Sequence, residues 1–226
     1  MSSTKKEGGI VARYSAEPFF AFHSIGAYED TADGSIVVDL PWMKNYTFLE
    51  AARVKNLRAN VGRPNGTNPH DLPATFRRYR LPNVLDQAQG DQPREAVFDF
   101  ELPFGTCNIE LPVLNDAYRL KPSRYAYGIH VEKPGFLADS LVKIDNQQRK
   151  SLVYVPKTET LCSEPIFVAS PNPTSEDDGV LLSVVMDSTK RKSSMVVVAA
   201  KQMTEIGRAN MPFVMGYGFH ATYAAA

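Results

Sequence analysis

Short apolar runs separated by polar loops recur along most of this chain, and they limit its fold more than any other feature. Residues 74–81 and 96–102 alternate apolar with charged side chains, as half-buried antiparallel strands do. Residues 179–186 and 194–199 are near-continuous apolar runs, and the polar segment 187–192 between them predicts a hairpin. Three further strands are expected at 124–131, 140–145 and 151–155. Many short strands in successive hairpins favour an all-β fold: a sandwich, a barrel or a set of propeller blades.

One segment, residues 46–60, predicts a helix instead. Apolar side chains recur there near a period of 3.6 without an internal Pro or Gly, at Phe48, Leu49, Ala52, Val54 and Leu57. The turn-rich residues 62–71 predict a loop. No sequence repeat of about 40–50 residues is visible. Nothing marks an internal boundary, so we expect residues 1–226 to form one domain or one fragment of a domain.

Composition narrows the function classes. The chain carries 25 Lys and Arg against 25 Asp and Glu, so it has no basic field that would attract nucleic acid. Cys107 and Cys162 have neither a disulfide-framework nor a metal-ligand spacing, which favours two buried, reduced thiols in the cytosol. No apolar run reaches the roughly 18 residues of a membrane span. Residues 1–9 lack the apolar core of a secretory signal. We therefore expect a soluble, cytoplasmic chain.

Two of the four histidines stand inside apolar, strand-like runs. His23 follows an aromatic stretch, and His220 follows an apolar one. A buried imidazole must be hydrogen-bonded or metal-bound, because an unpaired buried polar group costs on the order of a few kcal/mol. An ordinary core histidine is the alternative at each position. His70 lies in the polar loop, and His130 ends a tyrosine-rich strand, where a core or rim histidine is the better interpretation.

Two glutamates, Glu110 and Glu164, also stand within apolar, strand-like runs. A buried carboxylate needs a partner, and the free N–H of a metal-bound histidine is a well-motivated one. An equally supported alternative is that each carboxylate bonds to backbone amides or to a surface arginine. The acidic run 176–179 lacks the alternating ligands of a calcium loop, so a hairpin turn is the better interpretation.

Several segments together resemble the carotenoid oxygenase family. This family includes carotenoid and apocarotenoid cleavage dioxygenases, the retinoid isomerase and stilbene-cleaving oxygenases. The order and spacing of the segments are similar to the C-terminal half of the family. The matching segments are 18–23 with 27–30, 109–112 with Asn115, 125–128, 141–145, 163–168, 176–183, 203–209 and 218–220.

The resemblance implies a seven-bladed β-propeller with Fe(II) on its axis, held by four histidines, three of them oriented by glutamates. His23 is similar to the third ligand and His220 to the fourth. Glu110 is similar to the glutamate that orients His23, and Glu164 to the one that orients His220. Inner strands of different blades meet at a propeller axis, so the two imidazoles should converge, each bonded to its glutamate.

The first two ligands and the remaining glutamate would belong to N-terminal blades that this chain does not contain. We therefore expect residues 1–226 to be the C-terminal portion of a propeller, all-β with a short helical insertion near 46–60. A missing N-terminal half would be the partner that completes the site, with one Fe(II) per complete propeller.

The implied activity is that of a non-haem Fe(II) dioxygenase, which uses O2 to cleave a conjugated C=C bond of an apolar carotenoid or apocarotenoid. The alternatives are a stilbene-cleaving oxygenase of the same family and a non-catalytic fragment or degenerate paralogue. Phe19 and Phe219 flank the ligand positions and are candidates for lining the substrate. Peripheral membrane contact is compatible with the resemblance. Two positions depart from the family pattern: Gly26 replaces a common Asn, and Ala221 replaces a common Gly.

Overall fold

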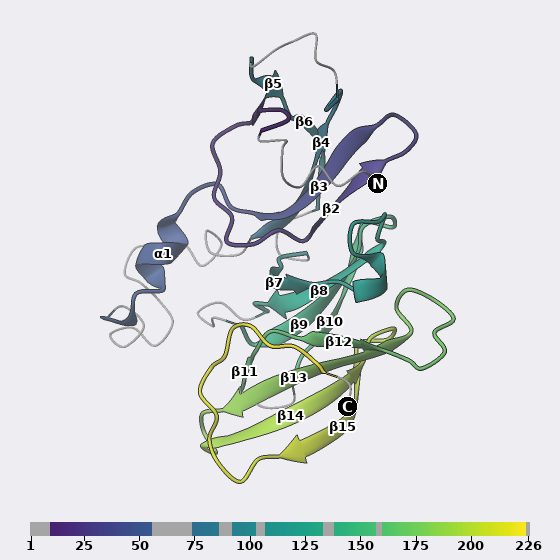
Figure 1. Ribbon diagram of the computed structural model, residues 1–226. Coiled ribbons are helices and arrows are strands. Elements are labelled where there is room, and N and C mark those ends of the chain that lie inside the picture. The colour runs from purple at the N-terminus through teal and green to yellow at the C-terminus, as the bar shows by residue number, and fades with distance from the viewer. Residues whose placement is uncertain are drawn as a thin grey trace.

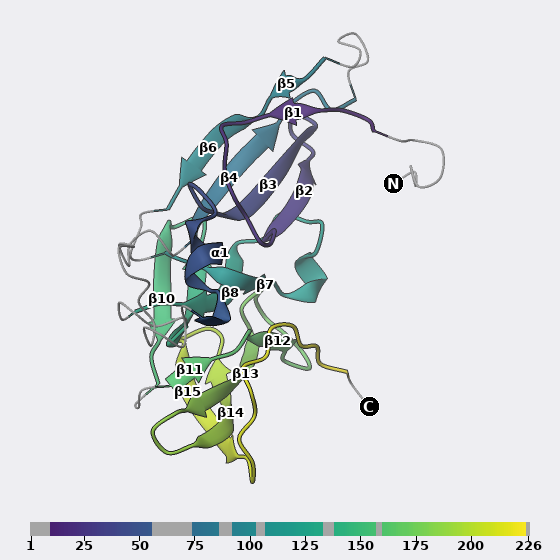
Figure 2. The same cartoon turned by 90° about the vertical axis from the view of Figure 1, so that its left-hand side faces the viewer.

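Three antiparallel β-sheets, stacked one above another in the order of the chain, form most of the described part of this computed structural model (Figures 1 and 2). The structure describes residues 10–55, 74–85, 92–102, 107–132, 138–156 and 160–224. Hairpin-connected sheets in sequence order are the arrangement of consecutive blades in a β-propeller. The predicted all-β, partial-propeller fold is confirmed. No helix within the described ranges has the length and apolar character to cross a membrane.

The first sheet has the strand order β2-β3-β4-β6. Its strands are β2 (Gly26–Asp30), β3 (Ser35–Trp42), β4 (Thr75–Leu81) and β6 (Val97–Glu101). The strands predicted at 74–81 and 96–102 are therefore confirmed. Two short strands beside this sheet, β1 (Tyr14–Ser15) and β5 (Arg94–Glu95), form a parallel pair.

The second sheet lies between the other two and has the order β7-β8-β9-β10. Its strands are β7 (Glu110–Val113), β8 (Tyr125–His130), β9 (Ser140–Asp145) and β10 (Lys150–Tyr154). A 3-10 turn at Asp116–Tyr118 lies between β7 and β8. The three strands predicted in this part of the chain are confirmed. Strands β8 and β9 are buried at nearly every position because sheets cover both of their faces.

The third sheet is built on one long hairpin. Its strands are β11 (Thr160–Cys162), β12 (Ile166–Ala169), β13 (Gly179–Asp187), β14 (Lys192–Ala199) and β15 (Thr204–Asn210). Strands β11 and β12 both pair with β13, one after the other. Asp187 pairs with Lys192 across the turn, so the predicted hairpin is confirmed.

The helix predicted at 46–60 is shorter where the structure describes it. Helix α1 spans Thr47–Ala51, and Ala52 caps its C-terminal end. Residues 56–60 of the predicted helix lie outside the described residues, and so does the loop predicted at 62–71.

Two hydrophobic clusters join the sheets. The cluster between the first and second sheets includes Ile25, Phe76 and Phe100 with Ile109, Val142 and Ile144. The cluster between the second and third sheets includes Leu111, Tyr127 and Leu141 with Cys162, Leu181 and Val196. Cys107 and Cys162 are buried thiols, as predicted. Burial of apolar surface between the sheets is thus the main force that holds their mutual orientation.

Strand β4 is more deeply buried than its sequence pattern predicted. The alternation predicted a half-buried strand, but the first five residues of β4 are buried, including Arg77 and Arg78. Asp39 accepts two hydrogen bonds from Arg78, of 2.7 and 2.8 Å. Glu101 accepts one of 2.6 Å from Arg77, whose guanidinium also lies over the Trp42 ring. Buried charges require such partners, and carboxylates on neighbouring strands supply them.

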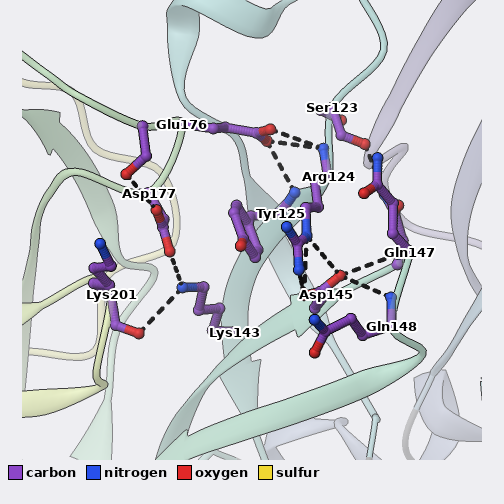
Figure 3. A network of polar contacts seen from close by, with 12 residues as sticks. Ser123, Arg124, Tyr125, Lys143, Asp145, Gln147, Gln148, Glu176, Asp177 and Lys201 are labelled. Carbon is purple, nitrogen blue, oxygen red and sulfur yellow. Dashed lines mark hydrogen bonds and ion pairs between the residues drawn. The ribbon is translucent and has the colours of Figure 1, made fainter.

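The loop between β12 and β13 attaches the third sheet to the second through its carboxylates (Figure 3). Glu176 accepts hydrogen bonds from the backbone N–H groups of Arg124 and Tyr125, at 2.9–3.0 Å. Asp177 accepts one of 2.7 Å from the buried ammonium of Lys143. The acidic run is therefore a hairpin connection, as predicted, and its carboxylates bind groups of the protein.

Replacement of Lys143 by Met should destabilise the fold strongly, because it leaves Asp177 as a buried charge without its cation. We expect a loss of about 3–5 kcal/mol in the free energy of unfolding, measured by urea titration at neutral pH. Lys190→Met is the matched control, since its pair with Asp187 is exposed on the lysine side and should contribute about 1 kcal/mol or less. Equal losses in the two variants would contradict the prediction.

The same ion pair predicts an acid-dependent loss of stability. Burial raises the pKa of Asp177, but the hydrogen bond and the charge of Lys143 outweigh it, and the net pKa lies below its usual 3.8. The folded state therefore binds this proton less readily than the unfolded chain. The stabilisation is present above the unfolded pKa and is lost as the pH falls through the lower, folded value. Unfolding measured from pH 6 to about pH 2 should show a shallower acid decline in Asp177→Asn, and an unchanged profile would refute this.

Candidate metal centre

The chain bulges at His23, where the first strand of the first sheet begins. Phe20 forms an isolated bridge with Met43, and Gly26 pairs with Asp39. Between these two pairs the chain advances six residues from Phe20 to Gly26 but only four from Asp39 to Met43. Two residues near His23 therefore have no pairing partner on β3. A bulge re-aims a side chain that a regular strand would place on one face of the sheet. His23 lies within this irregular stretch, three residues before β2 begins, and contacts the second sheet through Glu110.

Glu110 stands at a similar irregularity, at the start of the second sheet. Glu110 pairs with Ile129, and Val113 pairs with Tyr127. Between these pairs β7 advances three residues and β8 only two, so β7 contains one extra residue. Leu111 takes a left-handed φ of 45° within this bulge, and its N–H donates to Oε2 of Glu110 at 2.9 Å. The bulge turns the carboxylate back toward its own backbone.

Glu164 lies in the break between β11 and β12, at the start of the third sheet. Cys162 pairs with Val185, and Ile166 pairs with Leu182. The chain thus advances four residues between these pairs on the side of Glu164 but only three on β13, which leaves one extra residue there. The side chain of Glu164 is only 8% exposed. The sequence analysis placed both glutamates inside strand-like runs, whereas the structure places each at an interruption of a strand.

Each glutamate contacts the histidine with which the sequence paired it. Nδ1 of His23 lies 2.7 Å from Oε2 of Glu110. Nδ1 of His220 lies 3.1 Å from Oε1 of Glu164, whose other oxygen accepts the N–H of Ala221 at 2.9 Å. A carboxylate on Nδ1 favours the tautomer that is protonated there and leaves the Nε2 lone pair available.

The two histidines converge although almost the whole chain separates them. Their ring centroids lie 5.2 Å apart, with the ring planes at 77° to each other. Neither Nε2 has a hydrogen-bond partner among the residues that the structure describes. Within the same residues, no group of three or more His, Cys, Asp or Glu is arranged to hold a metal ion. The arrangement therefore offers two imidazole donors, each oriented by a carboxylate.

His220 differs from its prediction in its setting. The sequence pattern predicted a strand-like, apolar run, but residues 211–224 after β15 form no strand, and the His220 side chain is 66% exposed. This C-terminal segment runs back along the third sheet toward β12 (Figures 1 and 2). Two hydrogen bonds between Ser193 and Met215 attach its first half. Contacts to Glu164 attach its second half.

Burial controls the electrostatics of Glu110. Its pKa is raised because burial disfavours the carboxylate, and the hydrogen bonds from Leu111 and His23 offset this only in part. Its Oε1 atom is buried and has no hydrogen-bond partner within the described part of the chain. A positive charge on or near His23 would therefore favour the ionised form of Glu110.

The aromatic neighbours of the site differ in part from the prediction. Phe22, which the sequence analysis did not single out, lies 6.2 Å from the His23 ring, between it and Phe48 of α1. Phe19 stacks on Tyr79 at 6.2 Å, and Phe219 contacts Tyr217 edge-on at 5.4 Å. Both of the predicted lining residues are partly exposed. Only the aromatic stretch as a whole could have indicated Phe22.

The remaining histidines lie apart from this pair. His130 is a buried core histidine, as the sequence favoured, and its Nδ1 lies 3.0 Å from the carbonyl oxygen of Asn108. His70 lies outside the described residues. A cavity of about 850 Å³ opens between β10 and the third sheet, with Tyr154, Lys192 and Arg208 in its lining, and it includes neither site histidine.

The two departures from the family pattern are compatible with the local structure. A Cβ on Gly26 would lie 3.0 Å from Cδ1 of Leu114, so a larger residue would require Leu114 to move. Ala221 contributes its backbone N–H to Glu164, which the added methyl group does not affect. Neither substitution removes a contact of the histidine pair.

Sequence comparison assigns the chain to a family. The family model described as "Retinal pigment epithelial membrane protein" (RPE65) matches residues 2–225. The chain therefore belongs to the RPE65, or carotenoid oxygenase, family, as its motifs indicated.

Named relatives and solved structures agree with this assignment. A carotenoid dioxygenase of Neurospora crassa is 28% identical over 245 residues, covering 97% of this chain and 38% of the relative. The human mitochondrial carotenoid-cleaving dioxygenase is 32% identical over 248 residues, covering 97% and 41%. A structure of Synechocystis apocarotenoid oxygenase has a TM-score of 0.71 at 22% identity, covering 92% and 40%. A chimera of that enzyme and RPE65 has a TM-score of 0.72 at 22% identity. At these identities the solved structures show a shared fold, and the chain spans about 40% of the length of its relatives.

Gly128→Ala should disturb the site through the β7 bulge. A Cβ at Gly128 would lie 2.6 Å from the carbonyl oxygen of Glu110 and from Ile109, so the two strands would have to separate. We expect a loss of about 2–3 kcal/mol in the free energy of unfolding, as in other overpacked cores. Gly216→Ala is the matched control, because no atom lies within 4 Å of its added Cβ. A Gly128→Ala variant as stable as the control would contradict the strand contact.

Proposed function

We propose that this chain supplies two ligands, His23 and His220, to the Fe(II) centre of a dioxygenase that cleaves a conjugated C=C bond of a carotenoid or apocarotenoid. One observation carries the proposal: two histidine–glutamate pairs from opposite ends of the chain meet with ring centroids 5.2 Å apart. Structural burial alone gives no reason for two imidazoles, each with a carboxylate on Nδ1, to face one another. A shared metal ion does.

The residues present fit half of an iron site. Metal–imidazole bonds are about 2.1 Å long, and rings in contact at this separation can share one ion through their Nε2 atoms. Glu110 and Glu164 fix the tautomer that makes Nε2 the donor. The two further imidazoles implied by the family would complete the site from outside the residues that the structure describes.

The iron would supply the activation of O2 at an electron-rich double bond, since neutral imidazole ligands leave open positions on Fe(II). The residues of this chain orient the ligands and shape their surroundings. Phe22 covers one side of the His23 ring. Phe19 and Phe219 remain our candidates for contact with an apolar substrate, because both are partly exposed next to the ligand segments.

The substrate class follows from family membership and from the names of the relatives, which are carotenoid-cleaving enzymes. Stilbene cleavage is the alternative within the family. A second candidate is a chain that is non-catalytic as it stands. The exposure of His220 favours it, and two imidazoles alone would hold Fe(II) weakly. For location, the two buried thiols support the cytoplasm as our proposal, whereas the human relative is named as mitochondrial.

Co(II) binding tests the ligand assignment. The full chain, titrated with Co(II) and followed by visible absorption, should bind weakly, and His23→Ala or His220→Ala should each lower the affinity at least about tenfold. A cobalt-substituted structure of the Synechocystis relative supports this choice of ion. His70→Ala is the matched control and should bind as the wild type does. Equal binding by all four proteins would refute the assignment.

A further inference from the structure

Two buried polar atoms in the segments that carry the site lack hydrogen-bond partners among the residues that the structure describes. They are the hydroxyl oxygen of Tyr217 and Oε1 of Glu110. An unsatisfied buried polar group costs about 1–3 kcal/mol, so such atoms in a native fold call for an explanation. One of the two is a neutral donor and the other is a carboxylate acceptor. They are chemically matched.

Tyr217 packs against the part of the core from which the segments of both glutamates begin. Its ring packs against the cluster between the second and third sheets, which contains Leu111 and Cys162. Leu111 follows Glu110 in the chain, and Cys162 precedes Glu164 by two residues. Tyr217 thus packs against a cluster that includes a residue next to Glu110 and a residue two positions from Glu164.

Burial and the neighbouring acidic groups keep the Tyr217 hydroxyl protonated. Burial is the largest cause that raises the pKa of Tyr217, and Cys162, Glu164 and Glu110 raise it further. A phenol with a raised pKa beside carboxylates remains neutral and can donate a proton to a hydrogen bond.

We propose that Tyr217 is a positioning residue of the histidine pair, whose hydroxyl is linked by hydrogen bonds to Oε1 of Glu110 through one bridging water, since the two atoms make no direct hydrogen bond in this structure. Oε2 of Glu110 already accepts from both Leu111 and His23. A donor on Oε1 fixes the plane of the carboxylate, and the carboxylate in turn fixes the His23 ring. Since Tyr217 precedes His220 by only three residues, the same contact anchors the segment that carries the second histidine. The role as a positioning residue for metal ligands rests on the proposed function.

The experiment compares Tyr217→Phe with Tyr223→Phe in the full chain. Tyr223 is a matched control because it lies in the same segment, three residues beyond His220, with its side chain exposed. The first readout is the ¹⁵N spectrum of the imidazole of His23 in the metal-free protein, which reports the tautomer. The second is the Co(II) affinity, and the third is the thermal midpoint of unfolding.

Tyr217→Phe should shift the His23 resonances from the Nδ1-protonated form toward a mixture of tautomers and weaken Co(II) binding about tenfold. Tyr223→Phe should change neither. An unchanged His23 spectrum in a folded Tyr217→Phe variant would overturn the proposal and leave Tyr217 as a packing residue.

The metal-free spectrum separates this proposal from the proposed function. If the wild-type chain shows no Co(II) binding but Tyr217→Phe still shifts the His23 resonances, the hydrogen bond stands and the metal assignment fails. If Tyr217→Phe does not fold, the hydroxyl proton of Tyr217 in the wild type decides. A resonance shifted downfield, as for a hydrogen-bonded phenol, supports the proposal, and a resonance at the position of an unbonded phenol overturns it.

Discussion

The rest of the site depends on interruptions in the first strand of each sheet. A regular strand places alternate side chains on its two faces, so it cannot direct one polar group to a point outside the sheet while keeping its apolar residues in the core. Bulges at His23, Glu110 and Glu164 remove this restriction locally. At Leu111 the left-handed backbone costs on the order of 1–3 kcal/mol, and the hydrogen bond from its N–H to Glu110 offsets part of that cost.

Because the glutamates lie on different sheets, their separation is set by how those sheets pack. The cluster around Tyr127, Leu141 and Leu181 fixes the distance between the second and third sheets, but apolar contact alone tolerates sliding. The directional contacts of the β12–β13 loop remove that freedom, since Lys143 and Asp177 meet at 2.7 Å inside the protein (Figure 3). The ion pair of Lys143 and Asp177 thereby helps to hold the sheet that carries Glu164 against the sheet that carries Glu110.

Strand periodicity predicted the strands and the β13–β14 hairpin, and the resemblance to the family predicted both histidine–glutamate contacts. Two kinds of feature could not be predicted from the sequence. A bulge changes the register by one or two residues, and nothing in the runs around Glu110 or Glu164 encodes where the extra residue leaves the ladder. The burial of Arg77 was also invisible, because its carboxylate and aromatic partners lie on strands distant in the sequence. Tyr217 lies within an apolar run of the sequence, and the pattern of that run does not indicate a role for its hydroxyl.

The position of His220 shows why such distant support matters. A side chain on a sheet strand inherits its orientation from the hydrogen-bond ladder on both sides, whereas residues 211–224 have no ladder. Among the described residues, the hydrogen bonds that hold this segment are few: Ser193 bonds Met211 and Met215, and Glu164 bonds the imidazole of His220 and the N–H of Ala221. Exposed single contacts are weak and open easily. A buried anchor between these two attachment points would limit that opening more than any surface contact, and the ring of Tyr217 is the one partly buried aromatic side chain that the described segment inserts into the core there.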